Sequence, residues 1–209
     1  MQGKTHAAIG AATYVFFCNK LPGKFNILGM IITICSALLA DIDHPKSIVN
    51  KYILPIKNEK TKRVFYATVG IIILGFDNIY VRDSGLKAIA AVFIAISLNS
   101  HRNGFSHSFL GFVCFSIIGS LLEVKSKIPY FTFYIVIGYA GHLIGDMFTK
   151  QGIPLFYPVN NKKVKFPMTY VVGSKKGNAI ESVITMMIVL YIGYNLMPWS
   201  ILPFDAILK

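Results

Sequence analysis

Three short motifs in this chain combine histidines and aspartates at spacings that suit a metal site. The first, Asp41-Ile42-Asp43-His44, offers two carboxylates and an imidazole. On a helix, Asp41 and His44 lie three positions apart and share a face. Because carboxylate oxygen and imidazole nitrogen both ligate divalent ions, the tetrad is a candidate ligand set. The alternative is a polar helix end that meets water, with Asp43 paired to Lys46.

The second motif runs from Gly141 to Asp146 and contains His142. Its histidine and aspartate lie four positions apart, so a helix places them on one face. The carboxylate can ligate a metal beside the imidazole, or orient the ring by a hydrogen bond from behind. The alternative is a buried His–Asp pair that joins two helices. Ionisable groups next to a membrane span are costly to bury, which favours a functional role.

The third motif places His101 and His107 on either side of a polar break. Gly104 in this break allows a sharp turn, so both rings can face one site. Arg102 is a candidate catalytic residue because a guanidinium binds phosphate through two parallel hydrogen bonds. The alternative is a solvated loop in which Ser106 caps the following helix.

Two further residues are candidates by position. His6 lies near the start of an N-terminal helix, on the side of the predicted bundle where the three motifs lie. Glu181 follows a Gly- and Lys-rich loop and opens the last apolar segment, where it is a candidate general base or supporting carboxylate. The alternative for Glu181 is a favourable charge at a helix N-terminus.

The elements that must position these residues are apolar. Hydrophobic residues make up 54% of the 209 residues and charged residues only 14%, whereas a soluble domain is about 25% charged. The mean hydropathy is +0.57. We therefore expect one membrane-embedded domain over residues 1–209. No cleavable signal peptide is expected, because the N-terminus lacks a basic region followed by an apolar run and a cleavage site.

The apolar segments predict an all-α integral membrane bundle of about six to seven helices, since a bilayer span needs roughly 20 apolar residues. A further N-terminal helix, Thr5–Phe17, carries small residues that suit close packing. If every segment crosses once, all five histidines reach one face, together with most of the 21 Lys and Arg residues. The positive-inside rule then makes that face cytoplasmic. The candidate spans are Ile27–Asp41, Val64–Tyr80, Leu86–Leu98, Ser108–Leu122, Tyr130–Met147 and Glu181–Trp199.

The cysteines and the net charge narrow the possible partners. Cys18, Cys35 and Cys114 lie inside apolar stretches without a C-x-x-C pattern, so they are interpreted as buried apolar residues. A net charge of +12 suits nucleic acid, anionic lipid or the cytoplasmic loops of a membrane protein. The apolar composition favours the last two, and nucleic acid is disfavoured as a direct partner.

The three motifs together resemble those of the YdjM family, and the resemblance covers nearly the whole chain. It rests on Asp41-Ile42-Asp43-His44-Pro45-Lys46-Ser47, His101-Arg102-x-x-x-Ser106-His107-Ser108 and Gly141-His142-x-x-x-Asp146-x-x-Thr149. Members are described as membrane-bound, metal-dependent hydrolases, some under LexA control. They are grouped with the zinc-dependent phospholipase C and single-strand nuclease superfamily, whose members are helical and hold zinc with His and Asp. The resemblance implies these metal ligands: His6, Asp41, Asp43, His44, His101, His107, His142 and Asp146.

These observations predict a membrane-bound hydrolase in which water activated by a divalent metal attacks a phosphoester. Zinc is the expected metal, in two or three copies, with manganese as the alternative. Membrane lipid and a small or lipid-like phosphoester are the expected partners, and the oligomeric state is left open. One alternative is a metal or proton transporter, although the middles of most spans are apolar. Another is a non-enzymatic membrane scaffold or regulator with a structural metal.

Overall fold

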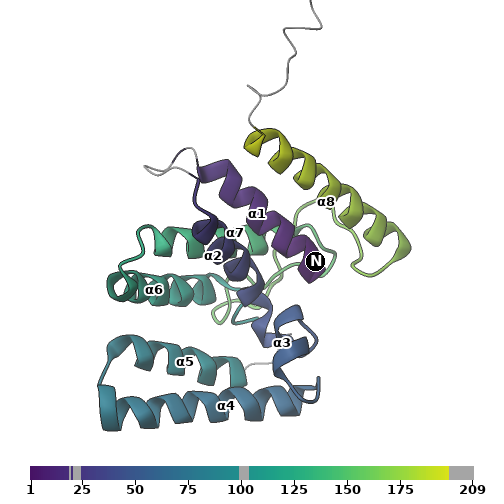
Figure 1. The fold of residues 1–209 in the computed structure, drawn as a ribbon. Helices are drawn as coiled ribbons and strands as arrows, with labels where there is room; N and C mark the ends of the chain where they lie inside the picture. Colours follow the sequence, from purple (N-terminus) through teal and green to yellow (C-terminus); the bar gives the residue numbers. More distant parts are fainter. Residues whose placement is uncertain (19, 21–24, 99–103, 198–209) are drawn as a thin grey trace, which may run out of the picture.

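Helices form on each of the apolar segments in the computed structural model, which describes residues 1–18, 20, 25–98 and 104–197. The fold is all-α, as predicted, and Figure 1 shows how the helices are arranged. Two short elements interrupt the α-helices, the 3-10 helix η1 (Ala40–Asp43) and the π-helical turn η2 (Asp77–Val81). The described ranges contain eight α-helices: α1 (Gly3–Cys18), α2 (Ile27–Leu39), α3 (Ile48–Ile53), α4 (Glu59–Phe76), α5 (Ser84–Leu98), α6 (Phe109–Ser126), α7 (Phe131–Met147) and α8 (Lys175–Leu196).

Polar N-caps explain why α3 forms in addition to the expected helices, and why α4 and α8 begin before the expected positions. Ser47 accepts a hydrogen bond from the backbone nitrogen of Asn50 and begins α3 within a segment expected to be a loop. Asn58 caps α4 and Ser174 caps α8, so both helices begin several residues before their apolar stretches. A capping side chain satisfies a backbone N–H that the first turn leaves unpaired, which stabilises a helix start in polar sequence.

The centre of the molecule is the crossing of α1, α2 and α7, with α6 packed against α7 (Figure 1). Helices α4 and α5 form an antiparallel hairpin beside this centre, and α8 packs against α1. Small residues permit the close crossings, as predicted for the N-terminal helix. A Cβ at Gly138 would lie 2.2 Å from the carbonyl oxygen of Thr33, and one at Gly10 would lie 3.0 Å from the Cβ of Ala37.

The first motif lies just after α2, in a turn that buried polar groups hold in place. Lys62 is fully buried, and its ammonium donates a hydrogen bond to the carbonyl oxygen of Asp43 at 3.0 Å. The amide of Asn50 donates to the carbonyl oxygens of Ile42 and His44 at 2.7 and 2.8 Å. Because unpaired buried polar groups are costly, these contacts hold η1 in one conformation.

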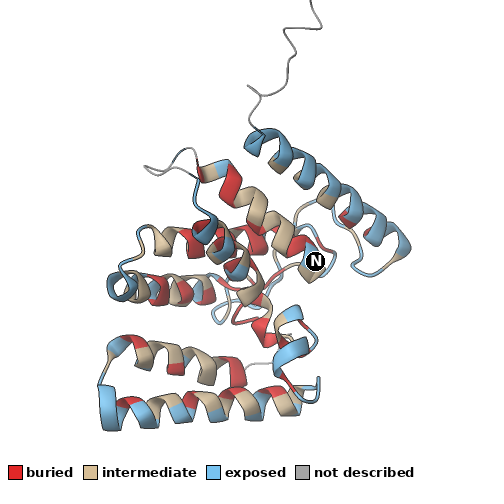
Figure 2. Cartoon of the chain, viewed as in Figure 1, coloured by how far each residue is buried: buried red, intermediate tan, exposed pale blue. Residues whose placement is uncertain are grey.

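Three helical segments of the described chain are long and apolar enough to cross a membrane: Glu59–Val81, Phe109–Ser126 and Lys175–Leu196. The remaining central helices are shorter, with 13 residues in α2 and 17 in α7. The buried core joins Tyr139 and Leu143 of α7 to residues of α4, α5 and α6, such as Tyr66, Ile96 and Phe115. Figure 2 shows α8 exposed along most of its length. Its exposed Met187, Leu190 and Tyr194 suit contact with lipid, since soluble proteins rarely expose such apolar surface.

The segment between α7 and α8 folds back over the loop that precedes α6. Two isolated bridges, Thr149 with Tyr170 and Ile153 with Val164, shape this segment. Gly104 has a φ of +74° and a Cβ there would lie 2.0 Å from Pro154 Cγ, so a side chain is excluded at this contact. The sharp turn expected at Gly104 is therefore present, and it aims the following residues into the bundle.

Candidate metal centre

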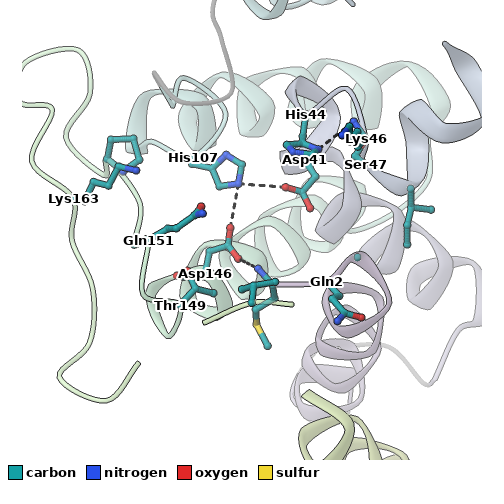
Figure 3. Close-up of a pocket in the computed structure, with 16 residues that line it drawn as sticks. Gln2, Asp41, His44, Lys46, Ser47, His107, Asp146, Thr149, Gln151 and Lys163 are labelled. Carbon is teal, nitrogen blue, oxygen red and sulfur yellow. Dashed lines mark hydrogen bonds and ion pairs between the residues drawn. The ribbon is translucent and has the colours of Figure 1, made fainter. Parts of the chain in front are cut away.

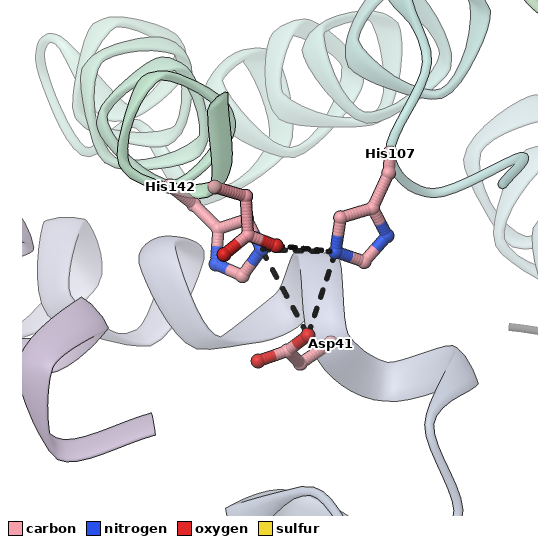
Figure 4. A group of neighbouring side chains, drawn as sticks. Asp41, His107 and His142 are labelled. Atoms are coloured by element: carbon pink, nitrogen blue, oxygen red, sulfur yellow. Dashed lines mark hydrogen bonds and ion pairs between the residues drawn. The ribbon is translucent and has the colours of Figure 1, made fainter. Parts of the chain in front are cut away.

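Four side chains that could ligate a metal lie close together at one end of the bundle in which α1, α2 and α7 cross (Figure 4). They come from three separate segments. Asp41 comes from η1, His107 from the loop before α6, and His142 and Asp146 from α7. One donor atom from each of the four lies within 4.8 Å of all the others. His142 is fully buried and His107 nearly so, whereas the two aspartates are partly accessible.

The separations between these donor atoms match the coordination sphere of one ion. The Nε2 atoms of His107 and His142 are 3.1 Å apart. His107 Nε2 lies 3.5 Å from Asp41 Oδ1 and 3.3 Å from Asp146 Oδ2, and His142 Nε2 lies 3.8 and 3.6 Å from the same two oxygens. Two ligands of a tetrahedral zinc ion, each bonded at about 2.0–2.1 Å, are about 3.3 Å apart.

The tautomer of His142 is set by the backbone of α2. Its Nδ1 lies 2.7 Å from the carbonyl oxygen of Ala37. A carbonyl oxygen only accepts hydrogen bonds, so Nδ1 carries the proton and donates it. In the neutral ring, Nε2 then presents its lone pair to the cluster. A hydrogen bond of this kind on the opposite ring nitrogen is usual for a metal-ligating histidine.

His107 is oriented by a relay that ends on Asp43. The hydroxyl of Ser106 donates to Asp43 Oδ2 at 2.6 Å, and its oxygen lies 2.9 Å from His107 Nδ1. The single hydroxyl proton is used on the carboxylate, so His107 Nδ1 donates to Ser106 and its Nε2 faces the cluster. Asp43, which the sequence suggested as a ligand, therefore lies behind His107. Ser108, rather than Ser106, caps α6.

If both rings were neutral in these tautomers, two Nε2 lone pairs would face each other at 3.1 Å, so the pair favours a proton or a metal cation on this side. Burial disfavours the imidazolium form of His107, but Asp146 and Asp41 outweigh this and raise the pKa of His107 well above its usual value. A proton on Nε2 therefore satisfies the cluster without metal. The donor set fits a divalent ion in place of that proton, because it supplies two imidazoles and two carboxylates.

His6 brings a third imidazole from α1 to the other side of the same carboxylates. Its ring stacks on His142 with centroids 3.7 Å apart. Its Nε2 lies 3.2 Å from Asp146 Oδ1 and 4.0 Å from Asp41 Oδ2. Although His6 is fully buried, neither ring nitrogen makes a hydrogen bond to any described residue. Each aspartate therefore turns one oxygen toward His6 and the other toward the first histidine pair, and the Asp146 oxygen that faces His6 also accepts a hydrogen bond from the amino group of Met1.

A polar cavity of about 510 Å³ opens beside the cluster (Figure 3). Asp41, His107 and Asp146 line it, so a ligand in the cavity reaches the donor atoms. Lys46 and Lys163 line the same cavity and add positive charge. Lys46 belongs to the first motif, where its position suggested a pair with Asp43, and nothing in the spacing of Lys163 distinguishes it from the other basic residues. Their role depends on two loops that meet only in the folded chain.

The remaining predicted site residues have other locations. His44 lines the cavity, and its Nδ1 accepts a hydrogen bond from the backbone of Lys46 at 3.2 Å. Glu181 is buried and accepts hydrogen bonds from the hydroxyl of Thr5 at 2.6 Å and from Tyr170 at 3.2 Å. It thus joins α8 to α1 one residue before His6. His101 and Arg102 lie outside the described residues.

A helical membrane protein with a buried His/Asp cluster beside a polar cavity is the class that the fold and the site define. The model of the YdjM inner membrane protein family matches residues 1–202, and the chain belongs to this family. The resemblance inferred from the three motifs is therefore confirmed, as is the expected location in a membrane. Neither a curated protein nor a solved structure matches the chain.

Proposed function

We propose that this protein is a membrane-bound, metal-dependent hydrolase that cleaves a phosphoester at one face of the membrane, expected from the positive-inside rule to be the cytoplasmic face. The observation that carries this proposal is the position of the four-donor cluster at the wall of a polar, lysine-lined cavity. Donors at ligand spacing provide a place for a metal, and the cavity provides a place for a substrate next to it.

Asp41, His107, His142 and Asp146 would hold the first ion. His6 and the second oxygens of the two aspartates would hold a second ion, provided that the amino group of Met1 leaves Asp146 Oδ1. Zinc suits imidazole and carboxylate donors, and manganese is the alternative. When bound, such ions lower the pKa of a water molecule and polarise a phosphoryl oxygen.

Residues of the protein bind the substrate and orient the metal ligands. Lys46 and Lys163 balance the negative charge of a phosphate in the cavity, and both are close enough to the cluster to line the same space. The Asp43–Ser106 relay keeps the ring of His107 aimed at the centre. Arg102 is proposed as a phosphate clamp. Glu181 is proposed as a supporting carboxylate, because through Thr5 it holds the start of α1.

Two observations favour a hydrolase over the alternatives. Four protein donors would fill a tetrahedral zinc site, so an open position for water would be at a second ion, near which the structure places fewer donors: His6 and the outer oxygens of the two aspartates. Asp41, His107 and Asp146 also border an open cavity through which a substrate would reach the cluster. A transport path would need polar groups through the depth of the bundle. The clustered donors instead gather at one end of α7 and beside η1.

The test is metal content and phosphodiesterase activity of the detergent-purified protein. The wild type, loaded with zinc or manganese, should retain near-stoichiometric metal and hydrolyse bis(4-nitrophenyl) phosphate. The double variant Asp41→Asn, His142→Ala should lose both while it remains folded by circular dichroism. Asp83→Asn is the matched control, because Asp83 pairs with Lys125 away from the cluster. A wild type that holds neither metal after loading would falsify the proposal.

A further inference from the structure

An apolar groove of about 500 Å³ lies between α1, α7 and α8, directly beside the metal centre. Ile9 and Phe17 line it from α1, Ala140 and Gly145 from α7, and Ile184 from α8. Gly145 immediately precedes Asp146, a donor of the cluster, and Met1 lines both the groove and the polar cavity. The two hollows, one polar and the other apolar, therefore adjoin at Met1, beside Asp146.

The groove extends away from the metal centre along two antiparallel helices. Near the centre, a Cβ at Gly145 would lie 3.1 Å from the side chain of Ile9. Toward the other end, the lining residues are Phe17 on α1 and Val136 on α7. Between Val136 and Phe148, at 1.5 Å rise per residue, the groove follows α7 for about 18 Å. That length suits a medium-length hydrocarbon chain.

The walls of the groove offer almost no polar contact. Thr13 is the one lining side chain with a hydroxyl among the described residues, and that hydroxyl donates to the carbonyl oxygen of Ile9 at 2.7 Å. Ile144 is 52% exposed although it is a large apolar residue. Because α8, which contributes Ile184 to one wall, is long and apolar enough to cross a membrane, we expect the groove to open toward lipid.

We propose that the substrate is an amphiphilic phosphoester whose hydrocarbon chain lies in this groove while its phosphate reaches the polar cavity. This inference rests on the proposed function and names the substrate class for the same site. The charges agree with it, since Lys46 and Lys163 line only the polar hollow. Burial of a chain against apolar walls is favourable for each CH₂ group removed from water.

A second apolar hollow provides an internal control. It lies between α2, α5, α6 and α7 and includes Cys35 and Ile89, and unlike the groove it shares no lining residue with the polar cavity. A chain bound there would leave its phosphate away from the cluster. Cys35→Phe and Ala140→Phe therefore fill two apolar hollows with the same side chain, and only the hollow that contains Ala140 shares a lining residue, Met1, with the polar cavity.

The first experiment compares dodecyl 4-nitrophenyl phosphate with methyl 4-nitrophenyl phosphate as substrates of the full-length, metal-loaded protein in detergent. In each hydrolysis, water oxygen bonds to phosphorus and the P–O bond to 4-nitrophenolate breaks. The products are the alkyl phosphate, 4-nitrophenolate and a proton. The wild type should prefer the dodecyl ester in kcat/KM, and Ala140→Phe should reduce this preference about tenfold or more. Cys35→Phe should keep the wild-type preference.

The second experiment measures chain position without turnover. A dodecyl phosphonate with a diazirine at the chain end should crosslink to peptides around Phe17 and Val136 in the wild type and in Cys35→Phe. The yield should fall in Ala140→Phe. Crosslinks spread evenly over the exposed faces of α4 and α8 would overturn the proposal.

The outcomes separate the two proposals. If the wild type and both variants hydrolyse the two esters with the same preference, the proposed chain site is wrong and the proposed hydrolase function is not. Crosslinks confined to the groove without hydrolysis of either ester support the chain site and refute the hydrolase.

Discussion

The relay from Asp43 through Ser106 to His107 leads to a quantitative prediction for Ser106→Ala. The hydroxyl of Ser106 makes two buried contacts, at 2.6 Å to Asp43 Oδ2 and 2.9 Å to His107 Nδ1. The substitution removes both and leaves the imidazole without its partner on the side away from the cluster. His107 then rotates more freely, and its Nε2 spends less time at the ligand position.

The size of the effect follows from what such partners contribute elsewhere. Loss of a hydrogen bond to a metal-ligating histidine typically weakens metal binding about 10–100-fold. Ser106 is fully buried, so we also expect a loss of about 1–3 kcal/mol in the free energy of unfolding, because a buried carboxylate loses a donor. The four ligands themselves remain, so binding should weaken without being abolished.

Zinc affinity is measured by competition with a chromophoric chelator in detergent at constant pH. Ser106→Thr keeps a hydroxyl at the same position and should bind zinc within a few-fold of the wild type. Ser116→Ala is the matched control, because Ser116 makes a comparable bond to the carbonyl oxygen of Phe112 within α6. Equal affinity of Ser106→Ala and the wild type would refute the orienting role of the relay.

Three further predictions follow from the geometry. The raised pKa of His107 keeps its ring protonated in the metal-free protein, whereas only the neutral ring binds a metal. Zinc affinity should therefore fall about tenfold for each pH unit below that pKa. Zinc titrations that give the same affinity at every pH would contradict this. His6→Ala should reduce the metal stoichiometry measured by elemental analysis but retain the first ion, since His6 faces only the second oxygens of the aspartates. Gly138→Ala places a Cβ 2.2 Å from a backbone oxygen of α2 and should destabilise the protein by about 1–3 kcal/mol in thermal unfolding. Gly75→Ala, where a Cβ meets nothing within 4 Å, should not destabilise it.

The sequence by itself determined those features of the protein that depend only on local backbone and helix geometry. The i, i+4 spacing of His142 and Asp146 places both on one face wherever a helix forms. Long apolar segments determined a helical membrane protein, because the backbone in lipid must satisfy its hydrogen bonds internally. The turn at Gly104 was also predictable, since it depends on the backbone freedom of a single residue. These features need no knowledge of how the helices pack.

The tertiary structure decided which predicted residues share one centre. Asp41 and Asp43 are two positions apart, yet one faces the cluster and the other hydrogen-bonds Ser106, because η1 is a tight 3-10 turn fixed by buried contacts. His6 reaches the same aspartates from α1 through a helix crossing that Gly10 and Gly138 allow. Spacing along the chain does not encode crossing angles or distances between helices. Those depend on how side chains from distant segments pack, and that packing brings five donors to one place.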